Sequence, residues 1–462
     1  MEFMLHYAWQ HRMFPLGGLT TTDGRRIEVI SPGIHNNDAG PDFLNARIEI
    51  DGMVWVGHVE IHLRASDWFR HHHEADSAYD AVVLHVVEHA DAEAVTSKGE
   101  RMAQVEMAVP ELVRENYNLL MAEDRIPRCG NPIPVVERGN GPQLTISHEP
   151  SVLSSLPRLL VTSWLAALTV ERLEWRMEQI LTRRERCDKD WEQTLFVTIA
   201  RNFGFGKNGD AFEQWALSIP MSAISKHRDD LFQIEAIFFG QAGLLESPSV
   251  TNRELQSASL PEPPDYFLRL KREYNFMKVK FGLQPLSSSI WKFARLRPQN
   301  FPHIRIAQLA TMYHEGRLNL SRLLVAADTR QIHDLLTTSV SDFWQTHYTF
   351  TSEPSDVNAK HLNSTSKDLI VINGVVPTLF AYGRYKSDED LCERAIGLLE
   401  SLPPEHNSII RTWHDAGIEC RSAADSQALL QLTTRYCQPR DCLHCRFGHE
   451  YIKRNPGYLR EE

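Results

Sequence analysis

The chain has 462 residues, of which 42% are hydrophobic and 24% charged, a composition that fits a globular protein of two or three domains and excludes a fibrous or fully disordered chain. Its formal net charge of -11 argues against a polyanionic partner, because phosphate binding relies on Lys and Arg to neutralise charge. No apolar run reaches the roughly 18 residues that span a bilayer, and residues 1–6 do not resemble a signal peptide. We therefore expect a cytoplasmic protein with no membrane partner.

The N-terminal part predicts a helix followed by a sheet. Apolar residues at helical spacing predict a helix within residues 2–14, and Ser66 is a candidate N-cap for a second helix that begins near Trp68. Short apolar and β-branched runs between turn residues predict five strands. They are residues 27–30, 43–50, 54–63, 81–89 and 102–109.

A Gly- and Pro-rich stretch separates this sheet from a long segment with helical periodicity. We predict an α+β protein in which a sheet domain precedes a mostly helical domain. The predicted divisions are a sheet domain at 1–126, a linker at 127–150, a helical domain at 151–435 and a cysteine-containing tail at 436–462.

Acidic and imidazole side chains interrupt two of the predicted strands. Asp42 follows a Gly-Pro turn, and the alternation of a strand places His58, Glu60 and His62 on one face of the next strand. Burying these groups costs several kcal/mol unless a partner or metal compensates. Carboxylate oxygens suit Mg²⁺ or Mn²⁺. The alternative is a polar strand face in contact with solvent.

An Asp followed on the next strand by Glu-x-polar resembles the PD-(D/E)XK nuclease superfamily, over about residues 1–110. The resemblance implies a restriction-endonuclease-like α/β/α domain in which Asp42 and Glu60 are catalytic metal ligands and Glu2 a further acid. His62 occupies the position of the superfamily's Lys and would act as general base or position the attacking water. Because His62 replaces this Lys, an inactive, degenerate site is the alternative interpretation. Other candidates for the same cleft are His58, Asp67, His71, Tyr79 and His85.

The abundance of histidine in this region also fits a zinc site, because imidazole favours Zn²⁺. No HExxH spacing supports that interpretation. The histidines concerned are His58, His62, His71, His72, His73 and His85.

Near the C-terminus, Cys437, Cys442 and Cys445 have the C-x4-C-x2-C spacing of zinc or iron-sulfur ligands. The fourth ligand is left open among Cys129, Cys420, His444 and His449. Some nucleases of the superfamily above hold an iron-sulfur cluster with one early and three late cysteines, a layout that would select Cys129. The alternative is a set of thiols without metal.

The acidic and basic residues are unevenly distributed. Residues 1–100 hold 7 Lys and Arg against 16 Asp and Glu, whereas residues 268–323 hold 11 against 2. Aromatics are interleaved with the cations, a pattern that favours DNA or RNA binding. The alternative is a core helix with a solvated basic face. The candidate phosphate contacts are Lys271, Arg272, Lys292, Arg295, Arg297 and Arg305.

Several phrases resemble an uncharacterised bacterial family with a domain of unknown function, a resemblance that implies no activity. They are GPDF at 40–43, VEIH at 59–62, SDW at 66–68, RLRPQNFP at 295–302 and YCQPRDCLHC at 436–445. We predict a metal-dependent phosphodiesterase or nuclease that acts on nucleic acid. The alternatives are a non-catalytic nucleic-acid-binding or scaffold protein and a protein with a structural zinc or iron-sulfur site.

Overall fold

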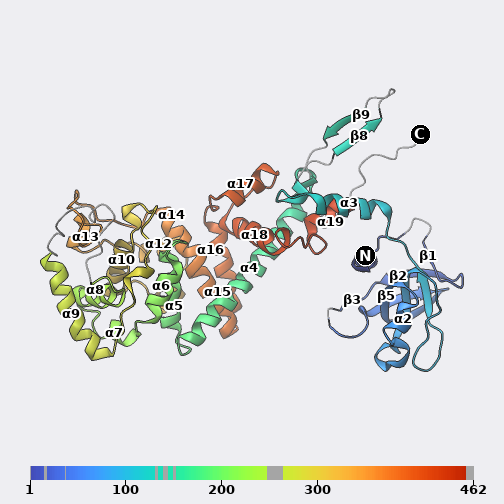
Figure 1. Ribbon diagram of the computed structural model, residues 1–462, viewed down its shortest axis with the longest axis horizontal. Helices are drawn as coiled ribbons and strands as arrows, with labels where there is room; N and C mark the ends of the chain where they lie inside the picture. The colour runs from blue at the N-terminus through green and yellow to red at the C-terminus, as the bar shows by residue number, and fades with distance from the viewer. Residues whose placement is uncertain are drawn as a thin grey trace. The chain divides into compact units, whose positions relative to one another are not determined.

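The computed structural model of the protein describes residues 2–14, 18–36, 38–130, 134–138, 144–148, 152–246 and 264–453. The chain forms two compact units, one of Met1–Leu156 with Thr433–Glu462 and one of Pro157–Leu432. The first unit contains a β-sheet and the second is built of helices (Figure 1). The prediction of a mixed chain with an N-terminal sheet and a mostly helical later part is thereby confirmed.

Seven strands form the sheet of the first unit, in the order β1-β2-β4-β5-β6-β7 with β3 paired to β4. Strands β2, β4 and β5 are antiparallel neighbours, and β5, β6 and β7 are parallel neighbours. The five predicted strands correspond to β2, β4, β5, β6 and β7, whereas β1 and β3 have two residues each and are too short to show an alternating pattern. The bounds are β1 Leu19–Thr20, β2 Arg26–Ser31, β3 Ile34–His35, β4 Phe43–Ile50, β5 Met53–Arg64, β6 Val82–His89 and β7 Ala103–Glu106.

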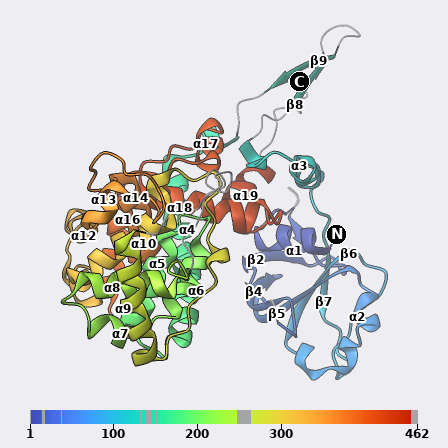
Figure 2. The ribbon, with the colours of Figure 1, turned by 60° about the vertical axis from the view of Figure 1, so that its left-hand side comes forward.

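Helices α1 (Glu2–Gln10) and α2 (Asp67–Arg70) both contact β5 (Figure 2). Helix α1 buries Trp9 and ends before the predicted Phe14, since Arg12 adopts a left-handed backbone with φ 54°. Helix α2 begins where predicted, and Ser66 is its N-cap residue. The Ser66 side chain makes no cap hydrogen bond, because its hydroxyl donates to Asp91 Oδ2 at 2.9 Å instead.

The stretch predicted as a linker contains an antiparallel strand pair, β8 (Pro134–Arg138) with β9 (Leu144–His148). The remaining residues of the stretch from 131 to 150 lie outside the described residues. Gly and Pro dominate its composition, yet two short β-branched runs lie between them, a signal that the linker prediction overlooked.

Residues predicted as a C-terminal tail pack within the first unit. Helix α19 (Arg446–Ile452) contacts α3 (Glu111–Ala122), and Asn116 Nδ2 donates to the Ile452 carbonyl at 2.9 Å. This contact joins segments more than three hundred positions apart in the sequence, so no local pattern could reveal it.

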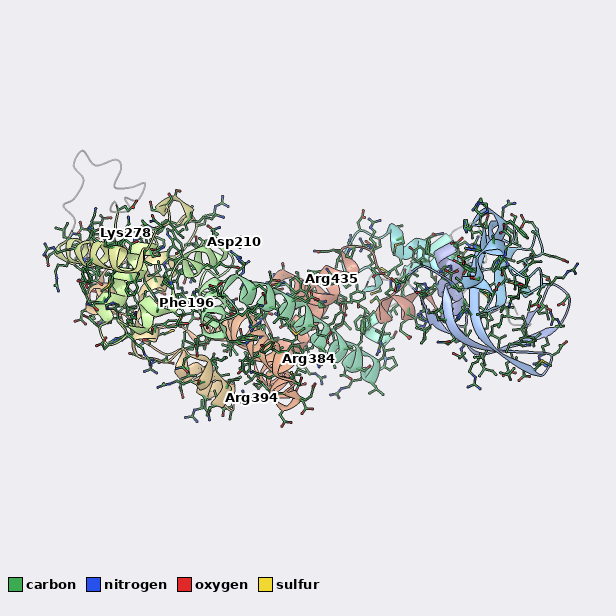
Figure 3. The ribbon with its side chains drawn as sticks, turned by 90° about the horizontal axis from the view of Figure 1, so that it is seen from below. Phe196, Asp210, Lys278, Arg384, Arg394 and Arg435 are labelled. Carbon is green, nitrogen blue, oxygen red and sulfur yellow. The ribbon has the colours of Figure 1, made fainter. Side chains whose placement is uncertain are left out.

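The second unit contains a large hydrophobic core, in which Phe196, Trp215 and Trp344 are completely buried; Figure 3 labels Phe196. Its longer helices are α4 Arg158–Arg186, α5 Trp191–Phe203, α6 Gly209–Leu217, α8 Leu231–Gln241, α9 Asp265–Phe281, α10 Pro302–His314, α15 Val376–Lys386, α16 Glu389–Ser401, α17 Ser408–Asp415 and α18 Ala423–Leu432. Shorter ones are α7 Met221–Ser225, α11 Leu320–Val325, α12 Thr329–Leu335, α13 Asp342–Thr346 and α14 Ser364–Ile370. Val371–Val375 form a π-helical turn between α14 and α15. None of the helices described combines the length and apolarity needed to cross a bilayer.

Glu235 places a carboxyl group in this core, where it is 1% exposed. Tyr266 Oη donates to one of its oxygens at 2.5 Å and Ser341 Oγ to the other at 2.8 Å. Burial nevertheless raises the pKa of Glu235 to about 7. The folded protein therefore keeps a proton there that the unfolded chain releases from about pH 4.5 upward, so this group lowers stability as the pH rises to about 7.

We expect Glu235→Gln to remove this pH dependence, since an amide carries no charge to bury. At pH 8 the variant should have a free energy of unfolding about 1–3 kcal/mol above the wild type, and at pH 4.5 about the same value. Urea denaturation at both pH values measures this difference. The exposed Glu400→Gln is the control, and equal stability of Glu235→Gln and wild type at pH 8 would contradict the expectation.

Candidate metal centre

A tight turn and a bulge bring Asp42 next to Glu60. Asp51 and Gly52 both have positive φ, 48° and 82°, and connect β4 to β5. The pairing of these strands shifts register between Phe43 and Ala46, where Asn45 has a φ of 57°. A bulge of this kind redirects the end of a strand.

Each of the two acids then accepts a backbone N–H from the other strand segment. Asp42 N–H donates to Glu60 Oε2 at 3.1 Å, and Ile61 N–H donates to Asp42 Oδ2 at 2.9 Å. Glu60 is 5% exposed and His62 2%, so the alternative of a strand face in contact with solvent is wrong. Val59 and Ile61 on the opposite face are buried as well, because the sheet is covered on both sides at this point.

Three imidazoles converge beside Glu60. Within the described part of the chain, the ligand atoms of His62, His71 and His73 lie within 4.8 Å of one another. Glu60 Oε1 is 3.6 Å from His62 Nε2 and 3.3 Å from His73 Nε2. His72 between them adopts a left-handed backbone with φ 61° and its side chain is largely exposed. This turn allows both of its neighbours to face His62.

A row of polar residues across the parallel strands sets the tautomer of His62. Glu60 on β5, His85 on β6 and Gln104 on β7 are register partners. Gln104 Nε2 donates to the Ala92 carbonyl at 3.0 Å, so its oxygen faces His85 Nδ1, 3.2 Å away. His85 Nδ1 therefore carries the proton, and His85 Nε2 accepts from His62 Nδ1 at 2.9 Å. It follows that His62 Nε2 keeps its lone pair on the side of His71, His73 and Glu60.

Burial dominates the electrostatics of this cluster. Desolvation, reinforced by the nearby Asp42, raises the pKa of Glu60 to about 9, and desolvation raises the pKa of Asp42 to about 6. Desolvation and the neighbouring imidazoles lower the pKa of His62 to about 2. A divalent cation stabilises the very forms that burial disfavours, namely a carboxylate beside neutral imidazoles.

The donor set fits a transition-metal ion better than Mg²⁺. Imidazole nitrogens with one carboxylate oxygen are characteristic ligands of Zn²⁺, whereas Mg²⁺ prefers oxygen alone. The predicted oxygen set of Asp42, Glu60 and Glu2 does not form a comparable group of three among the described residues. The histidine-rich interpretation of the sequence is the one that this geometry favours.

Other predicted cleft residues have separate roles. His58 Nδ1 lies 3.3 Å from the Asn45 N–H and accepts it, and Asp67 pairs with Arg70 at 2.9 Å. Tyr79 stacks on His73, with ring centroids 3.8 Å apart. His85 is fully buried and joins the cluster through its hydrogen bond with His62.

Sequence reasoning missed the contributions of Gln104 and His6 and assigned His73 only to the zinc alternative. His6 on α1 lies 3.5 Å from Asp42 Oδ2 through Nε2. The one available signal was His71-x-His73 after a short helix, and it could not show that His72 adopts a left-handed backbone.

Residues 2–408 match the family model described as Protein of unknown function (DUF2851). The chain belongs to this family. The match includes every residue of the histidine cluster and ends before Cys437. Neither the curated proteins nor the solved structures contain a match to the chain.

A substitution at Gln104 tests whether the row of Glu60, His85 and Gln104 orients His62 for metal binding in this DUF2851 chain. Gln104→Leu removes the acceptor for His85 Nδ1–H and frees His85 to take the other tautomer, so we expect zinc affinity to fall about 10- to 100-fold. Gln104→Glu keeps the acceptor and should retain most of the affinity. Competition with a zinc chelator measures both constants. Unchanged affinity in Gln104→Leu would show that the row does not orient His62.

A second group of metal-ligating side chains lies at the start of 3-10 helix Arg128–Gly130 and in residues 436–448. Cys129, Cys437, Cys442 and Cys445 line one small cavity together with Arg128, Tyr436 and Gly448. Arg128 Nη1 donates to the Cys437 carbonyl, and burial raises the pKa of Cys442 to about 11. Cys420 belongs to the other unit, where its Sγ lies 3.6 Å from the Ser422 carbonyl, so Cys129 is the cysteine brought to the cavity.

The distances between these sulfurs distinguish a single zinc ion from an iron-sulfur cluster as the group that they could bind. Tetrahedral Zn²⁺ with Zn–S bonds of about 2.3 Å requires sulfurs about 3.8 Å apart. In the described residues no three cysteine sulfurs lie within 4.8 Å of one another. The wider arrangement suits a polynuclear iron-sulfur cluster better than a single ion.

The predicted phosphate contacts of the basic segment occupy different environments. Lys292, Arg295 and Arg297 are exposed, as is Arg272, while Lys271 Nζ donates to the Glu246 carbonyl at 3.2 Å. Arg305 is buried, and its guanidinium donates to Gln308 at 2.9 Å and Asn300 at 2.7 Å. Of the interleaved aromatics, Phe267, Tyr274 and Trp291 belong to the hydrophobic core.

Proposed function

We propose that the first unit is a metal-dependent phosphodiesterase or nuclease, with a transition-metal ion, Zn²⁺ in the first instance, bound by His62, His71 and His73. The observation that carries the proposal is the convergence of three imidazole ligand atoms within 4.8 Å beside the buried carboxyl group of Glu60. Such a set needs a cation or additional protons to be stable in a buried position.

The order of elements supports phosphodiester hydrolysis as the reaction. Helix α1, the antiparallel strands β2, β4 and β5, helix α2 and the parallel strand β6 follow one another as in a restriction-endonuclease-like domain, a fold that we include in the proposal. Asp42 precedes β4 and Glu60 lies on β5, the positions of the acids in the PD-(D/E)XK motif.

When bound, the ion would polarise the phosphodiester and lower the pKa of an attacking water. Glu60 borders two of the imidazoles and is placed to take the proton from that water. His71 is exposed and the Asp42 side chain is 23% exposed, so these two residues form the open side of the cluster. Substrate would approach there, with Tyr79 holding the ring of His73 in place.

The test uses the purified full chain, with elemental analysis for bound metal and hydrolysis of bis(p-nitrophenyl) phosphate, DNA and RNA as activity. We expect stoichiometric zinc and hydrolysis that a chelator abolishes and Zn²⁺ or Mn²⁺ restores. Stoichiometric metal without hydrolysis of any substrate would favour the scaffold or binding alternative. Absence of bound metal would refute the proposal.

The cysteine cavity supports a second and structural role. We propose that Cys129, Cys437, Cys442 and Cys445 hold an iron-sulfur cluster that ties the C-terminal segment to the first unit. The positive charge of Arg128 beside the cavity would offset part of the negative charge of four thiolates. Zinc in place of iron would be found by the same elemental analysis.

A further inference from the structure

The helical unit contains a polar cavity that is lined by arginines. Arg176, Arg183 and Arg201 line it together with Gln179, Asn202 and Asn373, and Ile180 and Pro377 complete the wall. Arg176 and Arg183 lie seven positions apart on α4, two turns along one face of the helix, and Arg172 continues the same stripe. The lining contains no Asp or Glu.

The positive charge of this cavity is only partly compensated. Glu213 contacts Arg183 at 3.3 Å and Arg201 at 2.6 Å, and it is the buried acid of the group. Arg201 also reaches Asp210, which is 84% exposed and is labelled in Figure 3. Three lining arginines share one buried carboxylate, so the cavity retains an excess of positive charge.

The arginines retain unused donors. Arg176 Nη2 donates to Asn373 Oδ1 at 2.8 Å, but Arg176 Nε is buried and has no hydrogen-bond partner. Arg183 Nε is within ion-pair distance of Glu213 without hydrogen-bond geometry. Desolvation and the neighbouring Arg172 lower the pKa of Arg176 to about 10. A buried guanidinium with an unmet donor is costly, and an anion in the cavity would relieve the cost.

The wall opposite α4 departs from regular helix. Pro377 has no N–H and cannot bond to the Asn373 carbonyl four residues earlier, so the Asn202 amide donates to that carbonyl at 3.1 Å instead. Asn373 belongs to the π-helical turn Val371–Val375, and such turns are frequent at functional sites. The side chains of α5 and of the turn are thereby held together at the cavity.

We propose that this cavity binds a phosphoryl group, either inorganic phosphate or the dianion of a phosphate monoester. Guanidinium groups bind phosphate through paired N–H donors, and a dianion matches the excess of positive charge. The cavity is too small for a folded partner, so a small anion is the class of ligand that its donors can bind. The proposal is independent of the activity of the first unit.

The test measures binding of inorganic phosphate to the full chain by calorimetry and by thermal shift, with chloride adjusted to constant ionic strength. We expect saturable binding and a rise of the midpoint temperature in the wild type, and at least a tenfold loss of affinity in Arg176→Met. Arg384→Met removes a surface arginine of α15 that pairs with Glu174 and Glu389, and should bind like the wild type (Figure 3).

Gln179→Glu is the second variant, because it places a carboxylate inside the cavity and leaves every arginine in position. We expect it to raise the midpoint temperature without phosphate and to abolish the response to phosphate. Absence of saturable binding in the wild type, or an equal loss in Arg176→Met and Arg384→Met, would overturn the proposal.

The source of the phosphoryl group is resolved by comparing ligands. Tighter binding of AMP than of phosphate would indicate a small phosphate ester. Binding of a 5′-phosphorylated oligonucleotide, but not of its 5′-hydroxyl counterpart, would indicate a nucleic-acid end. Equal binding of both oligonucleotides, unaffected by Gln179→Glu, would contradict recognition of a phosphoryl group here.

Discussion

Glu60→Gln should abolish tight metal binding and lower phosphodiester hydrolysis by at least about 100-fold while the protein remains folded. The substitution is nearly isosteric, and the amide oxygen can still accept the Asp42 N–H that Glu60 Oε2 accepts at 3.1 Å. Its NH₂ group can donate to the lone pairs of His62 and His73, which lie 3.6 and 3.3 Å from Glu60 Oε1. In the variant, the amide therefore bonds to the imidazole lone pairs. In the wild type we propose that a metal ion binds them instead.

The measurement is metal content and hydrolysis, with the midpoint temperature recorded with and without a chelator. The wild type should lose stability when metal is removed, whereas Glu60→Gln should be insensitive to the chelator and at least as stable as the metal-free wild type. Glu49→Gln on β4, in the same sheet and outside the cluster, is the control. Wild-type metal content and activity in Glu60→Gln would rule out the proposed centre.

The second large effect is expected at the cysteine cavity. Cys129→Ser should remove iron from the purified protein, together with its visible absorption, and lower the midpoint temperature of the first unit by on the order of 10 °C. The loss is large because residues 437–445 are held to Cys129 across a sequence separation of about three hundred residues, and the cavity between them is lined by buried thiols.

Cys420→Ser is the matched control, since Cys420 was an equal candidate for the fourth ligand from the spacing of the sequence. We expect it to keep its metal and its stability. If Cys129→Ser and Cys420→Ser behave alike, the four cysteines are ordinary buried thiols. Zinc without iron in the wild type would retain the structural role and replace the cluster by a single ion.

Much of the fold followed from local patterns. The strands β2, β4, β5, β6 and β7 were predictable because alternating or continuous apolar runs are the direct consequence of strand geometry. The pairing of Asp42 with Glu60 was expected from adjacent strands. The linker prediction missed β8 and β9, because Gly and Pro were weighted above two short β-branched runs.

The candidate metal centre was harder to predict from the sequence. His73 and Gln104 enter it through the left-handed backbone at His72 and through the parallel register of β5, β6 and β7, neither of which has a clear sequence signature. The prediction of oxygen ligands for Mg²⁺ rested on the two acids. The imidazoles decide the donor chemistry, and their convergence depends on a turn that follows α2.

The amino-acid sequence was sufficient to establish an N-terminal sheet, a helical second part and a polar patch on β5, since each depends on periodicity within a few residues. Tertiary structure alone decided which histidines meet at Glu60, that Cys129 rather than Cys420 joins the late cysteines, and that arginines of α4 and α5 share a cavity with Asn373. These groupings join residues from separate elements, and their energies come from burial and charge in the folded chain, quantities that no local pattern contains.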